Sequence, residues 1–380
     1  MTSVGFFNPL ANASRSRLVL DMGWVLADSG FRVVLVDLDP AASLTELIGA
    51  LDRASSTMFD ALTAARYGAA IPAVVEIEAS LLIAAADPRL ASLDATAVTD
   101  SSATELRDAL HRLIAALAAD ADADFVLCDL PAGLGALARA GLACVGPVWV
   151  PVSGRKLESY VATGLASTWA SWNGVSESPR DRFDWIEVHV GHDAENARAA
   201  AARFLDVLGG RVVGRLKEFP SLSTLASVAR KPTVALSTAD GANDSQLAAV
   251  ADLRRQHEAL ATTLLACVGF HRDDAFREKV ELALYSVLSD DIPSVLDSLS
   301  PGTRIHSISD VEMERIEVRR GGVRVTGGAS VDVDLHWGSR DDAVDRSASF
   351  PLRFELDLDR SHASANEVRR LDVDTSSFHE

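Results

Sequence analysis

The chain has 380 residues, a formal charge of −18, and a composition that is 48% hydrophobic and 24% charged. This length and composition predict a packed core in one large or two ordinary domains, and they exclude a disordered chain. The acidic balance repels phosphate backbones, so a nucleic-acid partner is not favoured. No apolar run is long enough for a membrane span. The three cysteines lack CxxC spacing and suit a reducing compartment, so we expect a cytoplasmic protein.

The chain opens with alternating strand and helix patterns. Residues 4–7 form a short apolar run, and after a polar segment apolar residues recur at helical spacing up to Gly30, a helix stop signal. Residues 32–40 are nearly all apolar and rich in Val, which predicts a strand buried on both faces of a parallel sheet. Asp37 and Asp39 lie at its carboxyl end, where ligand sites of open α/β sheets gather.

The same alternation continues to about residue 268. Further strands are predicted over 124–129, 145–152, 185–190 and 211–216, and helices over 103–119, 157–169, 194–208 and 246–267. Strands that alternate with helices predict a doubly wound, mostly parallel sheet. We therefore assign residues 1–268 to one α/β domain.

The hydrophobic period changes after about residue 270. Residues 273–299 predict one or two helices, and apolar and polar residues then alternate with a period of two over 331–337 and 350–359. This alternation predicts an antiparallel meander with one solvated face. We assign residues 269–360 to a C-terminal α+β module and residues 361–380 to a polar, frayed tail.

The C-terminal part is the more acidic one. Residues 265–380 hold 23 Asp and Glu against 14 Lys and Arg. Two explanations stay open: a docking surface for a basic partner, or a solvated β-face, which is the commoner case. Asp332, Asp334 and His336 share one strand face and are of the types that bind divalent ions. The alternation of an acidic strand produces the same pattern without a metal.

Four segments of the N-terminal domain carry a resemblance to a known family. They are 5–9 (GFFNP) with 22–27 (MGWVLA), 34–45 (VLVDLDPAASLT), 124–135 (DFVLCDLPAGLG), and 218–222 with 229–233. Together they resemble the ParA/MinD-type ATPases over roughly residues 1–265, which implies a P-loop NTPase-like fold. The resemblance implies that Asp39 orients an attacking water, that Asp129 supports Mg²⁺, and that Pro220 lies where family members close over the base.

The phosphate loop departs from the family's pattern. The family octet, KGGVGKT followed by Thr or Ser, falls on residues 10–17, which read LANASRSR. Side chains replace the glycines whose bare backbone approaches phosphate. Leu10 stands at the signature lysine, and Arg15 stands at the loop lysine with its charge kept but a bulkier planar head. Ser16 keeps the hydroxyl that family members offer to Mg²⁺.

We therefore expect a pseudo-ATPase with impaired or absent hydrolysis, because phosphoryl transfer depends almost wholly on positioning and charge stabilisation. It would act as a regulatory or scaffolding protein through a protein partner or as a homodimer, with no resident cofactor. If nucleotide binds, Arg15, Ser16, Asp129 and Pro220 would hold ATP, with Mg²⁺ on Ser16 and Asp129, and Asp39 would be a residual catalytic acid. The alternative is an unconventional ATPase of DNA partition or defence that binds ATP and Mg²⁺ and uses Arg15 as its loop cation.

Overall fold

The computed structural model describes residues 2–8, 13–68, 74–96, 100–153, 183–190, 194–338, 344–359 and 366–378. The chain divides into two compact units, Met1–Ala261 (unit 1) and Thr262–Glu380 (unit 2). The division falls inside helix α11 (Asp244–Cys267), a few residues before the expected boundary at 268.

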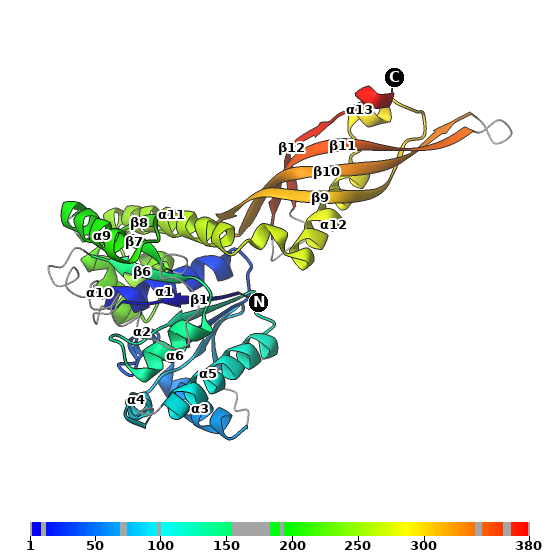
Figure 1. The fold of residues 1–380 in the computed structure, drawn as a ribbon. Coiled ribbons are helices and arrows are strands. Elements are labelled where there is room, and N and C mark those ends of the chain that lie inside the picture. Colours follow the sequence, from blue (N-terminus) through cyan, green and yellow to red (C-terminus); the bar gives the residue numbers. More distant parts are fainter. Residues whose placement is uncertain are drawn as a thin grey trace. The chain divides into compact units, whose positions relative to one another are not determined.

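Unit 1 is built on an eight-stranded sheet in the order β3-β4-β2-β5-β1-β6-β7-β8 (Figure 1). The strands are β1 (Thr2–Phe6), β2 (Val33–Asp37), β3 (Val74–Glu78), β4 (Leu81–Ala84), β5 (Phe125–Asp129), β6 (Val148–Val152), β7 (Phe183–Val190) and β8 (Arg211–Glu218). All neighbouring pairs are parallel except β3 and β4, which are antiparallel. The doubly wound, mostly parallel sheet predicted from the sequence is confirmed.

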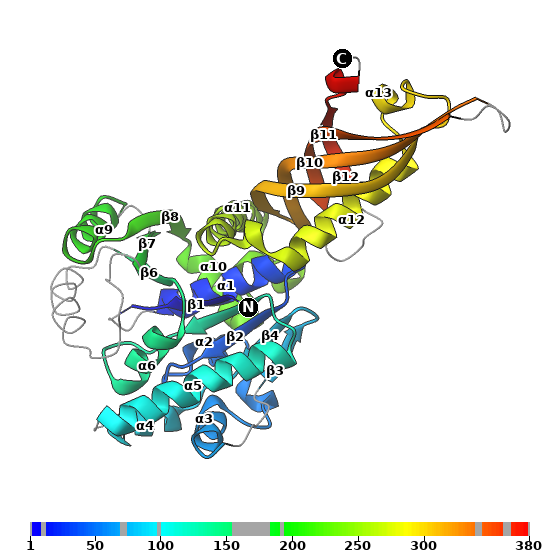
Figure 2. The same cartoon turned by 45° about the vertical axis from the view of Figure 1, so that its right-hand side comes forward.

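The central strands are buried along their whole length because helices cover both faces of the sheet. Every residue of β2, β5 and β6 is buried. Val34 and Val36 join the core on one face, and Leu35 points to the other, where Gly23 of α1 (Ala13–Asp28) packs so closely that a Cβ would lie 2.6 Å from Leu35 Cδ2. Figure 2 shows α5 (Asp100–Asp120) and α6 (Ala136–Cys144) on one side of the sheet and α1 on the other.

The described helices of unit 1 are α1 (Ala13–Asp28), α2 (Ser43–Leu47), α3 (Met58–Arg66), α4 (Ala91–Thr96), α5 (Asp100–Asp120), α6 (Ala136–Cys144), α9 (Ala194–Leu208), α10 (Pro220–Ala229) and α11. Among them, α1, α5, α9 and α11 match predicted helices, whereas α2, α3, α4, α6 and α10 were not predicted. The helix expected over 157–169 lies outside the described residues. Strands β3 and β4 were not predicted, because β3 exposes three of its five residues at the sheet edge and β4 has only four residues.

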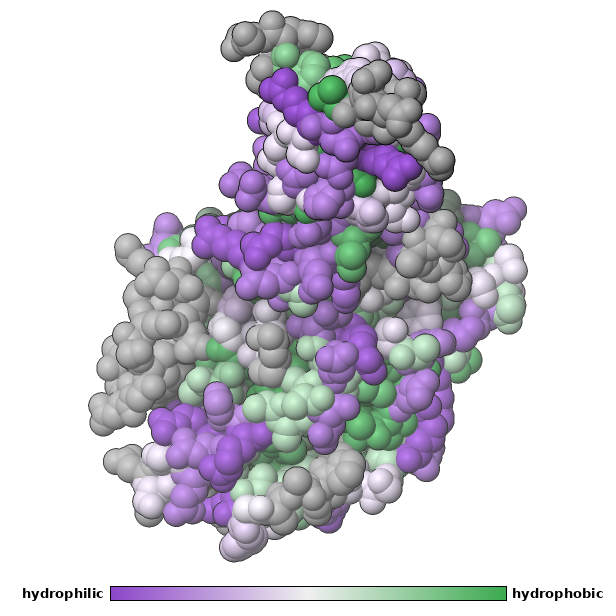
Figure 3. Space-filling model, turned by 90° about the vertical axis from the view of Figure 1, so that its right-hand side faces the viewer, coloured by the Kyte–Doolittle hydropathy of each residue, from purple (hydrophilic) through white to green (hydrophobic). Residues whose placement is uncertain are grey.

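Unit 2 is a four-stranded antiparallel sheet in the order β12-β11-β10-β9. The strands are β9 (Arg304–Arg319), β10 (Gly322–Trp337), β11 (Val344–Leu358) and β12 (Glu367–Val373), and α12 (Asp274–Asp290) and α13 (Ser294–Asp297) precede them. The predicted α+β module with a meander is confirmed. Hydrophilic residues make up most of the described surface of this unit in Figure 3.

The expectation of a frayed tail from residue 361 is wrong for most of its described part. Leu352–Asp357 of β11 pair with Glu367–Val373 of β12, so the tail adds a strand to the sheet. Beyond β12, the Phe378 ring stacks on Trp337 with the ring centroids 6.4 Å apart. It also makes an edge contact with Phe350, with the centroids 6.0 Å apart. The backbone of β11 offers ladder hydrogen bonds that local composition does not reveal.

None of the described helices is both long enough and apolar enough to cross a membrane.

Candidate functional site

The sequence-predicted site begins in the first turn of α1. Residues 10–12 of the expected phosphate loop lie outside the described part, whereas Arg15 and Ser16 belong to α1. Both are buried, each with only 1% of its surface exposed. Their burial follows from the packing of α1 against the sheet, which points this turn at the carboxyl ends of β2 and β5.

The structure brings Arg15 together with both predicted acids. Asp129 is the last residue of β5, and Asp39 follows β2 by two residues. Arg15 Nε donates to Asp129 Oδ1, and Arg15 Nη2 donates to Asp39 Oδ2 at 2.5 Å. The guanidinium therefore bridges the two carboxylates that the family resemblance assigned to water activation and Mg²⁺.

Burial and charge oppose each other at this ion pair. Burial disfavours the charged guanidinium, but Asp129 and Asp39 outweigh it, so the pKa of Arg15 is raised. Burial also raises the pKa of Asp129, although Arg15 opposes this change. Asp129 Oδ2, Ser16 Oγ and Arg15 Nη1 are buried without a hydrogen bond of ordinary geometry to any described residue.

Asp37 is a third carboxyl group at this edge, and the sequence analysis assigned it no role. It is opposite Asp129 in the parallel register of β2 and β5. It accepts hydrogen bonds from Thr45 N (2.9 Å), Thr45 Oγ1 (2.8 Å) and Asp39 N (3.0 Å). Burial, together with the charge of Asp129, raises its pKa to about 8. The sequence did hold a signal for this position, because Asp37 and Asp129 both lie at the end of a predicted buried strand.

Pro220 lies at a separate groove. It is the first residue of α10, and it lines a groove of about 570 Å³. The other lining residues come from α1, α2, the end of β8 and α10, namely Arg17, Ser43, Glu46, Leu47, Glu218, Ser223, Thr224 and Ser227. Arg15, Ser16, Asp39 and Asp129 are not among the lining residues. Arg17 Nη2 donates to Ser227 Oγ at 2.7 Å and to the Ser223 carbonyl at 3.3 Å, so its side chain spans from α1 to α10.

Asp332, Asp334 and His336 share the solvated face of β10, as the alternation predicts. Asp332 and Asp334 lie opposite Ser349 and Ser347 of β11. Asp332 accepts from Ser307 and Ser309 hydroxyls at 2.7 and 3.1 Å, so neighbouring hydroxyls satisfy it.

The acids farther along β11 do not join this group. Glu355 and Asp357 pair instead with Arg324, at 3.0 and 2.6 Å. Within the described ranges, no group of three or more His, Cys, Asp or Glu side chains is placed to hold a metal ion.

Two family models match this chain, one within unit 1 and one within unit 2, and neither covers residues 185–272. A family model described as "AAA domain" matches residues 13–184, and one described as "Predicted pPIWI-associating nuclease" matches residues 273–379. No curated protein matches the chain.

Solved structures match the fold of unit 1. The MinD cell division protein of Aquifex aeolicus is 16% identical, with a TM-score of 0.50 over 70% of this chain and 97% of MinD. An ATP complex of a McdA variant from Cyanothece is 13% identical, with a TM-score of 0.51 over 70% and 96%. A plasmid partition protein of Borrelia burgdorferi bound to AMPPNP is also 13% identical, with a TM-score of 0.51 over 70% and 98%.

The residues present at the strand ends do not fit a nucleotide with Mg²⁺ as they are arranged. The Asp129 Oδ2 and Ser16 Oγ oxygens are of the hard type that Mg²⁺ prefers. The guanidinium of Arg15 is bound to Asp129 and Asp39, so it already neutralises both acids and its charge repels a divalent cation. Because the Arg15 guanidinium is directed at Asp129 and Asp39, it is not directed at a phosphate.

Proposed function

Unit 1 has the ParA/MinD-type P-loop ATPase fold, and from that premise we propose that this chain is a pseudo-ATPase that acts as a regulatory or scaffolding binding protein. Unit 1 supplies the scaffold, and unit 2 supplies a second binding surface. Hydrolysis of ATP is absent or strongly impaired.

The observation that carries this proposal is the bridge from Arg15 to Asp129 and Asp39. A loop cation stabilises a phosphoryl-transfer transition state only when it is directed at the transferring group. Here the guanidinium is buried, and two of its nitrogens are engaged by the acids that would otherwise act on water and metal. Withdrawing it from them would expose unpaired buried carboxylates, which is costly.

The family match of unit 2 supports a protein partner. The family that matches residues 273–379 is described as associating with pPIWI proteins, and MinD has a solved complex with MinC. The residues over 265–380 carry an excess of nine acidic groups, 23 against 14. A partner with a basic docking surface suits this charge. A homodimer through unit 1 is the second form of association that we propose.

The test is a calorimetric titration of the full chain with ATP, with and without Mg²⁺, run beside a phosphate-release assay. We expect neither saturable micromolar binding nor phosphate release. Micromolar binding together with phosphate release would refute the pseudo-ATPase.

One observation favours a second candidate, which is a role in nucleic-acid-directed defence. It is the match of residues 273–379 to a family described as a nuclease. In this candidate the chain is an unconventional ATPase of the ParA type, with Arg15 as its loop cation. It predicts that Arg15→Ala and Asp39→Ala abolish ATP hydrolysis, while Arg66→Ala, at a surface pair with Glu105, leaves it unchanged. Incubation of the full chain with labelled DNA and RNA in Mg²⁺ or Mn²⁺ tests the nuclease part directly.

A further inference from the structure

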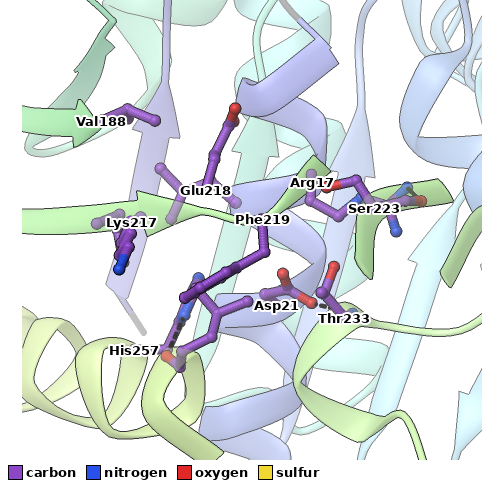
Figure 4. Close-up of a pocket in the computed structure, with 12 residues that line it drawn as sticks. Arg17, Asp21, Val188, Lys217, Glu218, Phe219, Ser223, Thr233 and His257 are labelled. Carbon is purple, nitrogen blue, oxygen red and sulfur yellow. Dashed lines mark hydrogen bonds between the residues drawn. The ribbon is translucent and has the colours of Figure 1, made fainter. Parts of the chain in front are cut away.

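A small pocket lies inside unit 1, and Arg15 and the acids at the strand ends are not among its lining residues. Its lining includes Arg17 and Asp21 of α1, His257 of α11, and also Phe219 and Thr233. Figure 4 shows Asp21 between His257 and Thr233. It holds about 30 Å³ of free space for water-sized spheres. One water molecule needs roughly 10–15 Å³ of such space, so the pocket has room for an ordered water.

Three polar atoms of the pocket lining are buried without a hydrogen-bond partner in the described part of the chain. They are His257 Nε2, Thr233 Oγ1 and Arg17 Nη1. His257 and Thr233 are each only 2% exposed, so bulk solvent does not satisfy them. A buried polar atom left unpaired lowers stability, and three at one small pocket indicate a bound molecule.

The hydrogen-bonding roles of these atoms restrict what that molecule is. His257 Nδ1 lies 2.9 Å from the Leu253 carbonyl, which only accepts, so Nδ1 carries the proton. Nε2 of the neutral ring is then an acceptor that needs a donor. Arg17 Nη1 is a donor that needs an acceptor, and the Thr233 hydroxyl takes either role. The bound molecule therefore both donates and accepts.

The charges around the pocket exclude simple ions. Asp21, which accepts from Thr233 N at 2.6 Å and from Val234 N at 3.4 Å, lines the pocket with Glu218 and opposes an anion. Arg17 and Lys217 line it as well and oppose a cation. An anion also lacks a hydrogen to donate to Nε2, and a metal cation cannot accept from Arg17.

We propose that this pocket is a hydration site that holds one ordered water molecule, which donates to His257 Nε2 and accepts from Arg17 Nη1 or Thr233 Oγ1. The water links α11 to α1, the helix that carries Arg15 and Ser16. Burial lowers the pKa of His257 and outweighs the charge of Asp21, which agrees with a neutral ring whose Nε2 accepts.

The test combines a high-resolution crystal structure of the full chain with NMR of histidine-labelled protein. We expect electron density for one water in the pocket, the Nδ1–H tautomer for His257, and a nuclear Overhauser effect from its ring to a long-lived water. The exposed ring of His111 serves as the internal control and should show no such effect. An empty pocket, an Nε2–H tautomer, or anomalous density from a bromide soak would each overturn the proposal.

A pair of threonine variants sharpens the result. Thr233→Val keeps the shape of the side chain and removes its hydroxyl, so the water signal at His257 should weaken or disappear. Thr224→Val changes a threonine that lines the outer groove and not this pocket, so the signal should persist. Equal loss in both variants would contradict the site. If Thr233→Val does not fold, the crystal structure of the unmodified chain and the tautomer of its His257 still test whether the pocket holds a water.

Discussion

Arg15 and Asp129 form an ion pair whose side chains are 2% and 0% exposed, at the point where α1 meets the end of β5. A second nitrogen of the same guanidinium, Nη2, lies 2.5 Å from Asp39 Oδ2, so one cation pairs with two carboxylates. The pair joins residues 114 positions apart in the chain. It therefore ties the first turn of α1 to the end of β5 and to the segment after β2.

The first prediction concerns the stability that depends on this pair. Arg15→Ala should lower the free energy of unfolding by about 3–5 kcal/mol, because it leaves buried carboxylates without a counter-charge. Arg66→Ala is the control: Arg66 pairs with Glu105 at 3.3 Å on the surface, and its loss should cost less than about 1 kcal/mol. Urea unfolding of both variants measures the difference. Similar small losses would show that Arg15 is not structurally required.

The second prediction is a pH dependence that belongs to Asp37. Its pKa in the folded chain is raised to about 8, and an unfolded Asp titrates near about 3.9. The folded state therefore favours the protonated acid, and this stability is complete below about pH 4 and is lost as the pH rises toward about 8. Asp37→Asn stays neutral throughout.

Urea titrations of both proteins between pH 4 and pH 9 measure that effect. The stability of the unmodified chain relative to Asp37→Asn should fall steadily as the pH rises through this window. A difference that does not change with pH would mean that Asp37 is ionised in the folded chain.

The third prediction concerns His257, whose contribution to stability changes with pH in the opposite direction to that of Asp37. Burial lowers its pKa in the folded chain, so its contribution to stability is present above the unfolded value of about 6.5 and is lost as the pH falls through the folded value. Asp21, Glu218, Arg17 and Lys217 are the charged groups that line its pocket.

Comparison of the unmodified chain with His257→Leu below pH 6.5 tests this point. The unmodified chain should lose stability more steeply on acidification, because only it must accommodate a buried imidazolium. Parallel stability curves for the two proteins would contradict the buried neutral histidine.

The fourth prediction tests the C-terminal end of unit 2. Phe378 stacks on Trp337 at 6.4 Å, contacts the edge of Phe350 at 6.0 Å, and lies 5.2 Å from the guanidinium carbon of Arg346. Phe378→Ala should lower stability by about 1–3 kcal/mol through these lost ring contacts. Hydrogen exchange should become faster in β10 and β11. Val344→Ala, at a side chain that is 60% exposed, is the control and should change little.

Much of the fold could be predicted because burial leaves a local record in the chain. The apolar runs of β2, β5 and β6 mark strands covered on both faces, and the two-residue period of β10 and β11 marks a sheet with one wet face. The short strands β3 and β4 leave no such record. Strand β12 was missed because β11, and not its own composition, supplies its hydrogen bonds.

The sequence by itself determined that acids stand at the ends of buried strands and that an arginine and a serine stand where the family places its loop lysine and hydroxyl. Only the tertiary structure decided that Arg15 forms ion pairs with Asp129 and Asp39. It likewise brought His257 of α11 close enough to Asp21 of α1 for their charges to interact. The physical reason is that periodicity specifies which face of a helix is buried, whereas charge pairing depends on which groups the folded backbone brings within a few ångströms. Burial then fixes the strength of that pairing, since the same groups in water would interact only weakly.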